Sequence, residues 1–204
     1  TARLIVEEMD AGNGIISLED LRDYRSIWRE PVIGEYKGVK VISMGPPSSG
    51  GIALLQLLGM ASFFDLSQSG HNKAQTVHLM TEMERRVYAD RAKHLGDPDF
   101  WEVPQDYLLD HQYLKARVGE INMDSATSSE EVQATDLSAL TESEQTTHYS
   151  IIDRHGTAVS VTTTINSGYG SKVFVTGAGF LLNNEMDDFS SKPGVPNLYG
   201  LLGG

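Results

Sequence analysis

The stretch Gln145-Thr146-Thr147-His148-Tyr149-Ser150 stands where a polar segment gives way to a strand pattern. Before it the chain is rich in Ser, Thr, Glu, Asp and Gln, and after it polar and apolar residues alternate as in a β-strand. If the peptide bond before Thr146 were cut, Thr146 would carry a free α-amine beside its own hydroxyl. A threonine hydroxyl is a weak nucleophile unless a base lies beside it, and an N-terminal amine can be that base. The polar segment is therefore either a connector between domains or a processing loop that presents the bond before Thr146.

The residues after this junction predict a β-hairpin. Two strand patterns, 146–152 and 158–166, flank the turn sequence Asp153-Arg154-His155-Gly156. Antiparallel pairing across this turn sets Thr146 opposite Thr164, whereas a slip of one residue would bring a side chain of the other face there. Threonine opposite threonine is by itself a common strand pairing. The predicted register nevertheless gives a physical reason for a second hydroxyl beside the first.

A dense polar cluster follows the next predicted strand. We expect residues 172–180 to form that strand, and residues 181–189 then bring three carboxylates and two amides together. Such a cluster could bind a cation or the amine of a substrate, or it could be a solvated turn. Residues 190–204 contain two prolines, four glycines and Tyr199, which is the composition of a covering loop.

The first part of the chain is predicted to be mainly helical. Helical patterns cover residues 1–30, 73–93 and 107–118, and residues 32–44 read as a hairpin. Ser17 and Asp20 have the spacing of a capping box. Over 73–93 we expect an apolar stripe to be buried, with Glu82 and Arg86 lying off that stripe.

Composition excludes several classes of protein. The 204 residues carry a formal net charge of −12, which disfavours nucleic acid as a partner. The absence of cysteine excludes disulfides, cysteine-ligated zinc and a thiol nucleophile. His71, His78 and His94 share no metal-ligand spacing with carboxylates, so we expect neither a metal nor a cofactor. The sequence contains no apolar run long enough for a membrane span and no signal peptide, and we expect both ends to be cuts within a longer protein.

Five segments together resemble the γ-glutamyltranspeptidases, a family of N-terminal-nucleophile hydrolases. The segments are 46–51, 88–91, 95–100, 146–150 and 181–204. They run through nearly the whole chain in family order, and their combination is specific although each alone would be weak. The resemblance implies an α+β fold that forms part of a four-layer αββα sandwich.

The resemblance also implies a reaction. A precursor would cut itself before Thr146, and the new N-terminal Thr146 would attack the γ-glutamyl amide of glutathione-like compounds to form an acyl-enzyme. Water, an amino acid or a short peptide would resolve that intermediate. By the same matching Thr164 would help to activate Thr146, and Tyr199 would close the site from the lid loop 193–204. Three residues would hold the α-amino and carboxylate ends of the glutamyl group: Asn166, Glu185 and Asp188.

The resemblance divides the chain into three parts. Residues 1–121 would be the mainly helical C-terminal part of a large subunit, 122–145 a flexible linker before the processing site, and 146–204 the N-terminal β part of a small subunit. Both subunits would come from one precursor. An extracytoplasmic location, periplasmic or secreted, is also implied.

Members of the family have much longer chains than this one. The arginine that clamps the substrate carboxylate has no counterpart here, and neither have the serine and glycine pairs that bind that carboxylate and form the oxyanion hole. Loss of one oxyanion donor costs about 10²–10³ in rate, so we expect the 204-residue chain alone to be poorly active or inactive.

Two kinds of alternative remain open at this point. One is a relative with another acyl specificity, such as a cephalosporin acylase or a poly-γ-glutamate depolymerase. Glu185 and Asp188 favour a substrate with a free α-amine, which weakens the acylase. The other is a non-catalytic interaction module on the same scaffold.

Overall fold

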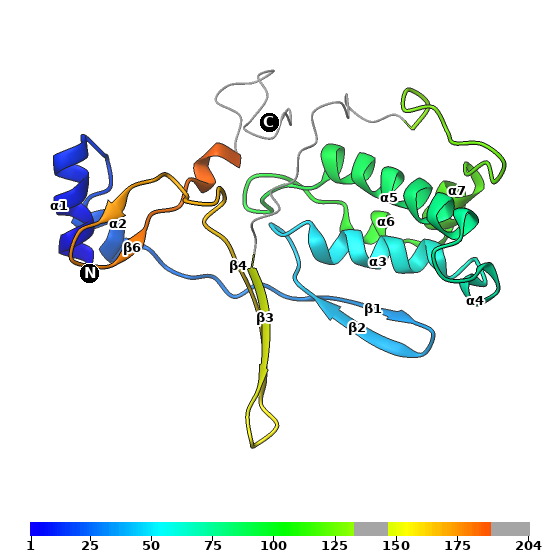
Figure 1. Cartoon of the computed structure of the whole chain (residues 1–204), viewed down its shortest axis with the longest axis horizontal. Coiled ribbons are helices and arrows are strands. Elements are labelled where there is room, and N and C mark those ends of the chain that lie inside the picture. The colour runs from blue at the N-terminus through cyan, green and yellow to red at the C-terminus, as the bar shows by residue number, and fades with distance from the viewer. Residues whose placement is uncertain (133–146, 189–204) are drawn as a thin grey trace. The chain divides into compact units, whose positions relative to one another are not determined.

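The structure is a computed structural model that describes residues 1–132 and 147–188 (Figure 1). The chain divides into two compact units, which are Thr1–Ser26 with Ser138–Gly204, called the hairpin unit below, and Ile27–Leu137, called the helical unit. Helices alternate with short antiparallel hairpins along the chain, which confirms the predicted α+β class.

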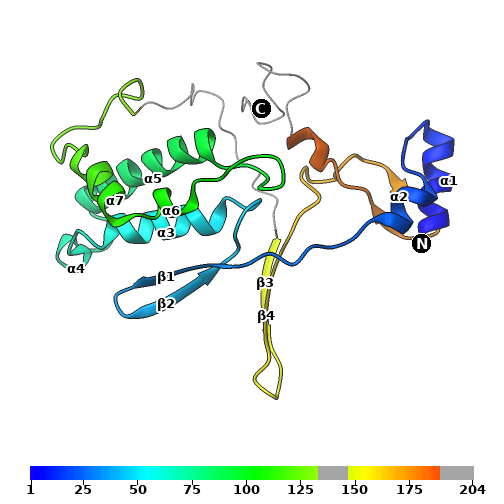
Figure 2. The ribbon, with the colours of Figure 1, turned by 180° about the vertical axis from the view of Figure 1, so that it is seen from behind.

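The helical unit begins with a β-hairpin and continues as helices packed around α3. Its elements are β1 (Val32–Tyr36), β2 (Val39–Ser43), α3 (Gly50–Ala61), α4 (Leu66–Ser69), α5 (Ala74–His94), α6 (Gln105–Leu108) and α7 (His111–Gly119). Figures 1 and 2 show α3 beside α5 from opposite sides. Apolar side chains of α3, α5 and α7, among them Met60, Met83 and Leu114, form one buried cluster.

Two glycines allow the β1–β2 hairpin of the helical unit to approach α3 closely. A Cβ atom on Gly51 would lie 2.0 Å from the backbone oxygen of Met44, and one on Gly34 would lie 2.6 Å from a methyl carbon of Leu55. No other residue fits at Gly51 without moving the backbone, because real Cβ atoms do not come that close to a carbonyl oxygen. The glycine at the start of α3 therefore fixes how the hairpin lies on the helix.

The buried face of α5 differs from the predicted one. Val77 and Met80 are about half exposed, whereas Glu82 and Arg86 are 1% exposed. Met83 and Val87 of the predicted stripe are buried as expected, but the prediction for Glu82 and Arg86 was wrong because it assumed that charged side chains point to water. Here the two charges are paired with each other at 2.7 Å between Arg86 Nη1 and Glu82 Oε2, and a buried charge is tolerated when it is paired and hydrogen-bonded.

The carboxylate of Glu82 has a full set of hydrogen-bond donors. Oε1 accepts bonds from Arg85 Nη1 at 2.8 Å and from the Thr127 N–H at 3.1 Å, and Oε2 also accepts one from Thr127 Oγ1 at 2.6 Å. Burial alone raises the pKa of Glu82, but the bonds from Thr127 and Arg86 and the charge of Arg85 outweigh it and lower the pKa to about 2. The carboxylate is therefore ionised at any ordinary pH.

A second buried carboxylate, Asp90, joins three helices. It accepts hydrogen bonds from Gln56 Nε2 of α3 at 2.8 Å, from the Tyr113 hydroxyl of α7 at 2.8 Å and from Arg117 Nη2 at 3.2 Å. Burial, together with the bond to Asp90, raises the pKa of the Tyr113 hydroxyl. Polar contacts therefore fix the helices relative to one another within the apolar core.

The helix predicted over 107–118 is interrupted. α6 ends at Leu108, and Asp110 caps α7 by accepting hydrogen bonds from the N–H groups of Gln112 and Tyr113 at 2.9 and 3.0 Å. Aspartate is a strong N-cap residue, so the chain begins a new helix there.

Part of the segment predicted as a linker is held by the helical unit. Thr127 bonds to Glu82 as above, and Val132 is 3% exposed. Residues 133–145 lie outside the described residues.

The hairpin unit combines short helices with two antiparallel strand pairs among its described residues. Its elements are α1 (Ala2–Gly12), α2 (Leu18–Asp23), β3 (Thr147–Ile152), β4 (Ala158–Thr163), β5 (Phe174–Val175), β6 (Phe180–Leu181) and the 3₁₀ helix η2 (Glu185–Asp188). The predicted capping box is present, because Ser17 Oγ accepts from the Asp20 N–H and Asp20 Oδ2 accepts from the Ser17 N–H. Residues 24–30 form no helix, contrary to prediction.

The single strand predicted over 172–180 is wrong. Two strands of two residues each, β5 and β6, pair there around a turn. Gly177 and Gly179 both have a φ of +80°, a backbone region that glycine enters without steric cost and that a continuous strand does not use. α1 contacts β5, and the side chains of Met9 and Val175 are buried in this unit.

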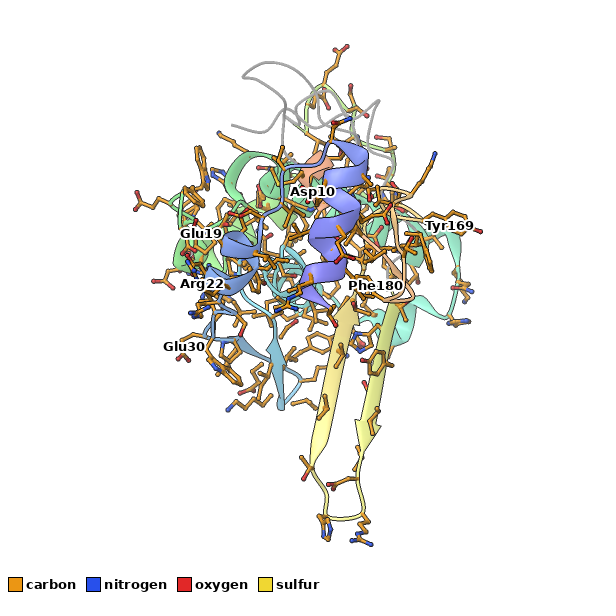
Figure 3. All side chains as sticks on the ribbon, turned by 90° about the vertical axis from the view of Figure 1, so that its left-hand side faces the viewer. Asp10, Glu19, Arg22, Glu30, Tyr169 and Phe180 are labelled. Atoms are coloured by element: carbon orange, nitrogen blue, oxygen red, sulfur yellow. The ribbon has the colours of Figure 1, made fainter. Side chains whose placement is uncertain are left out.

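The β3–β4 hairpin has the predicted register. Thr147 pairs with Thr163 and Ile152 with Ala158, and the carboxylate of Asp153 holds the turn by accepting from the N–H groups of residues 155 and 157. Figure 3 shows side chains projecting from both faces of the β3–β4 hairpin, which is drawn in yellow. Every residue of β3 is exposed. Thr146 itself lies outside the described residues, so its pairing with Thr164 stays a prediction.

We expect Glu82→Gln to destabilise the protein by about 3–5 kcal/mol, because it removes the buried counterion of Arg86 and leaves only the half-exposed Glu120, 3.5 Å from Arg86 Nε. Urea unfolding of both proteins at pH 7 measures this difference. Folding lowers the pKa of Glu82 from 4.5 to about 2. The contribution of the ionised Glu82 carboxylate to the stability of the folded protein is therefore complete above pH 4.5 and is lost as the pH falls toward 2. The variant should therefore lose less stability than the parent over that range. Glu84→Gln, on the exposed side of α5, is the control and should change stability by less than about 0.5 kcal/mol.

Candidate functional site

The predicted site residues on the β4 side lie just beyond the end of that strand. The N–H of Asn166 donates a hydrogen bond to Thr164 Oγ1 at 2.9 Å. Asn166 has a φ of +71°, in the left-handed region that asparagine adopts more readily than most residues, and this turns its N–H back toward Thr164. Thr164 Oγ1 accepts with a lone pair, and its hydroxyl hydrogen remains a donor.

The side chain of Asn166 is buried, at 4% exposure, and reaches the predicted polar cluster. Its Nδ2 donates to the backbone oxygen of Asn184 at 3.0 Å. The Asn184 N–H in turn donates to the backbone oxygen of Ile165 at 3.2 Å. The structure thus brings the end of β4 and the polar cluster together, as a site built from both would require.

The polar cluster forms a compact turn. The Asn183 side-chain oxygen accepts from the Glu185 N–H at 3.0 Å, and η2 then carries Glu185, Asp187 and Asp188. Partial burial raises the pKa of Glu185, and the negative charge of Asp188 adds to that rise. Because the negative charge of Asp188 opposes the ionisation of Glu185, a cationic ligand beside these two carboxylates would relieve the repulsion.

A shallow hollow of about 620 Å³ borders this turn. It is lined by Ser167, Gly170, Ser171, Lys172, Asn183, Asn184, Met186 and Asp187. Gly170 allows its loop to lie against the backbone of Leu182, because a Cβ atom at Gly170 would lie 2.1 Å from the backbone oxygen of Leu182. Among residues 1–132 and 147–188, no group of three His, Asp or Glu side chains could hold a metal ion.

Sequence reasoning missed two residues of this arrangement, Ser167 and Asn184. Asn184 bonds to Ser167 through both its amide oxygen and its amide nitrogen. The two consecutive asparagines before Glu185 were a usable signal, because asparagine side chains often bond nearby backbone groups in turns.

The predicted site residues therefore fall into two groups. Thr164 and Asn166 are joined by a hydrogen bond, and Glu185 and Asp188 interact on η2. Thr146 and Tyr199 lie outside the described residues. None of the described helices is long and apolar enough to cross a membrane.

Comparison with known proteins bears on this arrangement. Residues 1–203 match the family model for gamma-glutamyltranspeptidase. Glutathione hydrolase proenzymes of Escherichia coli and Pseudomonas aeruginosa are 45% and 48% identical to the chain over its whole length, and the chain spans about a third of theirs, 35% and 36%. The crystal structure of Helicobacter pylori gamma-glutamyltranspeptidase is 40% identical with a TM-score of 0.63, over 70% of this chain and 41% of that one.

These matches agree with the five segments in which the sequence resembled the family. Both curated relatives carry the word proenzyme in their names, so each is made as a precursor. The match to the family model covers the helical unit as well as the hairpin and the polar turn. The chain belongs to the gamma-glutamyltranspeptidase family.

Proposed function

We propose that the protein is a γ-glutamyl hydrolase and transpeptidase that cleaves the γ-glutamyl amide bond of glutathione-like compounds. The observation that carries the proposal is the link between the end of β4, with Thr164 and Asn166, and the acidic turn with Glu185 and Asp188, in a chain that matches the family over residues 1–203. A hydroxyl beside the predicted nucleophile and an anionic site for an amine are the two parts that such a reaction requires.

The proposed nucleophile is Thr146, after the precursor cuts itself before that residue. Its α-amine takes the proton of its hydroxyl, the oxygen attacks the γ-carbonyl, and the leaving amine receives the proton as an ester forms. Water or the amine of an amino acid or peptide then attacks the ester, releasing glutamate or a new γ-glutamyl amide. The register of β3 and β4 supports a place for Thr164 beside Thr146, where its remaining hydroxyl hydrogen can be donated to the nucleophile.

The acidic turn supplies the proposed specificity. Glu185 and Asp188 would receive the α-ammonium of the glutamyl group, and Asn166 would help to hold it. A charge-assisted hydrogen bond contributes about 1.5–3 kcal/mol, so two such bonds discriminate strongly against substrates without a free amine. These carboxylates favour a substrate with a free α-amine, which weakens the alternative of an acylase acting on other acyl groups.

The remaining assignments belong to the same proposal. Residues 1–121 end the large subunit and 146–204 begin the small one, and both contribute to a four-layer αββα sandwich in an extracytoplasmic protein. The segment 122–145 joins them in the precursor, and Tyr199 closes the site from the lid loop.

The first test is the processing of the protein expressed at its full length. We expect two products, the smaller beginning at Thr146, and we expect Thr146→Ala to remain a single chain without γ-glutamyl hydrolysis. Mass spectrometry with N-terminal sequencing measures the first outcome, and release of nitroaniline from γ-glutamyl nitroanilide measures the second. Thr147→Ala, next in the chain, is the control and should be processed normally. An active wild-type protein with an unbroken chain would refute the proposal and favour a different nucleophile, and an inactive unbroken one would favour the interaction module.

The second test concerns the hydroxyl of Thr164. Thr164→Val keeps the shape of the side chain but has no hydroxyl, so we expect processing and turnover to slow by about 10²-fold, in the range of a lost acid–base contact. Thr164→Ser keeps the hydroxyl and should retain most of the rate. Single-turnover kinetics separates the chemical step from substrate binding, and an unchanged chemical step in Thr164→Val would remove this residue from the mechanism.

The third test concerns the carboxylate of Asp188. We expect Asp188→Asn to raise the KM for γ-glutamyl nitroanilide by at least about tenfold, because a charge-assisted bond is lost. The same change removes the negative charge that raises the pKa of Glu185, so the increase of KM on acidification should begin at a lower pH than in the parent. Asp10→Asn, an exposed change on α1, should alter neither quantity. A normal KM in Asp188→Asn would assign that carboxylate to structure.

A further inference from the structure

Two segments that the proposed function places around the substrate meet at Asn184, a residue to which that function gives no role. Its backbone oxygen accepts hydrogen bonds from Asn166 Nδ2 and from the Asp187 N–H, both at 3.0 Å. Its N–H donates to Ile165 at 3.2 Å. The backbone of one residue therefore contacts both the end of β4 and the turn of η2.

The side chain of Asn184 also joins the residues after β4 to η2. Nδ2 donates to Ser167 Oγ at 3.1 Å and to Asp187 Oδ2 at 2.9 Å, and Oδ1 accepts from the Ser167 N–H at 3.0 Å. A primary amide has two donor hydrogens, and both are used here. Reversing the amide would set its oxygen against the Asp187 carboxylate and its hydrogens against the Ser167 N–H, so only one orientation is compatible with these neighbours.

These contacts bear on Asn166 and Glu185. Asn166 is 4% exposed, so its Nδ2 group cannot readily exchange Asn184 for water, and losing that partner would cost the desolvation of a buried amide. Glu185 follows Asn184 directly in the chain, and the bond from Asn184 to Asp187 spans the turn that carries it. A displacement of Asn184 therefore moves both predicted amine-binding residues.

We propose that Asn184 is a positioning residue that holds Asn166 and Glu185 in one geometry for the α-ammonium of the substrate, an inference that rests on the proposed function. The ammonium is bound in the ground state and in the transition state alike. Loss of the positioning should therefore raise KM and leave kcat nearly unchanged. A residue needed only for folding would instead lower the amount of active enzyme and leave KM alone.

The test uses Asn184→Asp in the full-length protein after processing, with γ-glutamyl nitroanilide as the substrate. The variant keeps an oxygen that can accept from the Ser167 N–H but sets a carboxylate against the carboxylate of Asp187. We expect KM to rise about tenfold or more, with kcat within about threefold of the parent. Asn122→Asp makes the same chemical change in the helical unit, where the side-chain oxygen accepts from the Asp124 N–H, and should leave KM unchanged.

The double variant Asn184→Asp with Asp187→Asn separates positioning from damage. It exchanges the two groups, so the new amide at 187 can donate to the new carboxylate at 184, and Ser167 Oγ can rotate to donate as well. The net charge equals that of the parent. We expect KM to return to within about threefold of the parent value, because the hydrogen bond across the turn is restored with its direction reversed.

The outcomes distinguish this role from the proposed function. Wild-type turnover with an unchanged KM in Asn184→Asp, or a KM that stays raised in the exchange variant, would overturn the role of Asn184 alone. Absence of turnover by the processed wild-type protein would overturn the proposed function and this role with it. If Asn184→Asp does not fold, Ser167→Ala removes one acceptor of the same amide, and a KM unchanged from the parent would overturn the role.

Discussion

The helical unit depends on keeping the carboxylate of Glu82 hydrogen-bonded away from water. An isolated buried charge costs many kcal/mol, so the structure has to deliver donors to both oxygens. It does so from α5 itself, through Arg85 and Arg86, and from Thr127 outside the helix. The hydrogen bonds and charges of these donors more than offset burial and lower the pKa of Glu82 to about 2. The segment that follows α7 is therefore bound to α5 by the hydrogen bonds of Thr127 to Glu82, in addition to the apolar packing of Ile121.

The hairpin unit also has to provide hydrogen-bond partners for a buried polar side chain. Few of its apolar side chains are buried among the described residues, Met9 and Val175 being two of them, whereas the amide of Asn166 is almost fully buried. Its polar groups are therefore arranged by one another and by the backbone. Hydrogen bonds are directional in a way that apolar contacts are not, and a site built from them can hold a small ligand in one orientation.

Local signals made much of this structure predictable. The register of β3 and β4 followed from the turn sequence and the period of two, and the class of fold followed from the mixture of patterns. The buried face of α5 did not, because counting apolar residues treats every charge as outward-facing, and the pairing of Glu82 with Thr127 is not visible in the sequence. The strand over 172–180 failed at Gly177 and Gly179, where a left-handed backbone outweighs the strand composition. Asn184 was counted in the predicted polar cluster but given no role, because a polar turn and a binding turn have the same composition.

Asn166 is the residue through which recognition and chemistry are coupled in the proposed reaction. Its backbone N–H is bonded to the hydroxyl oxygen of Thr164, and its side chain is bonded to Asn184 beside Glu185. Because a single residue with a fixed left-handed φ makes both bonds, the hydroxyl cannot move relative to the amine-binding turn without straining that residue. A substrate anchored by its ammonium is then presented at a set distance from Thr164. Reactions that depend on positioning lose about 10²-fold in rate for a misplacement of about 1 Å, so this coupling is worth more than either hydrogen bond alone.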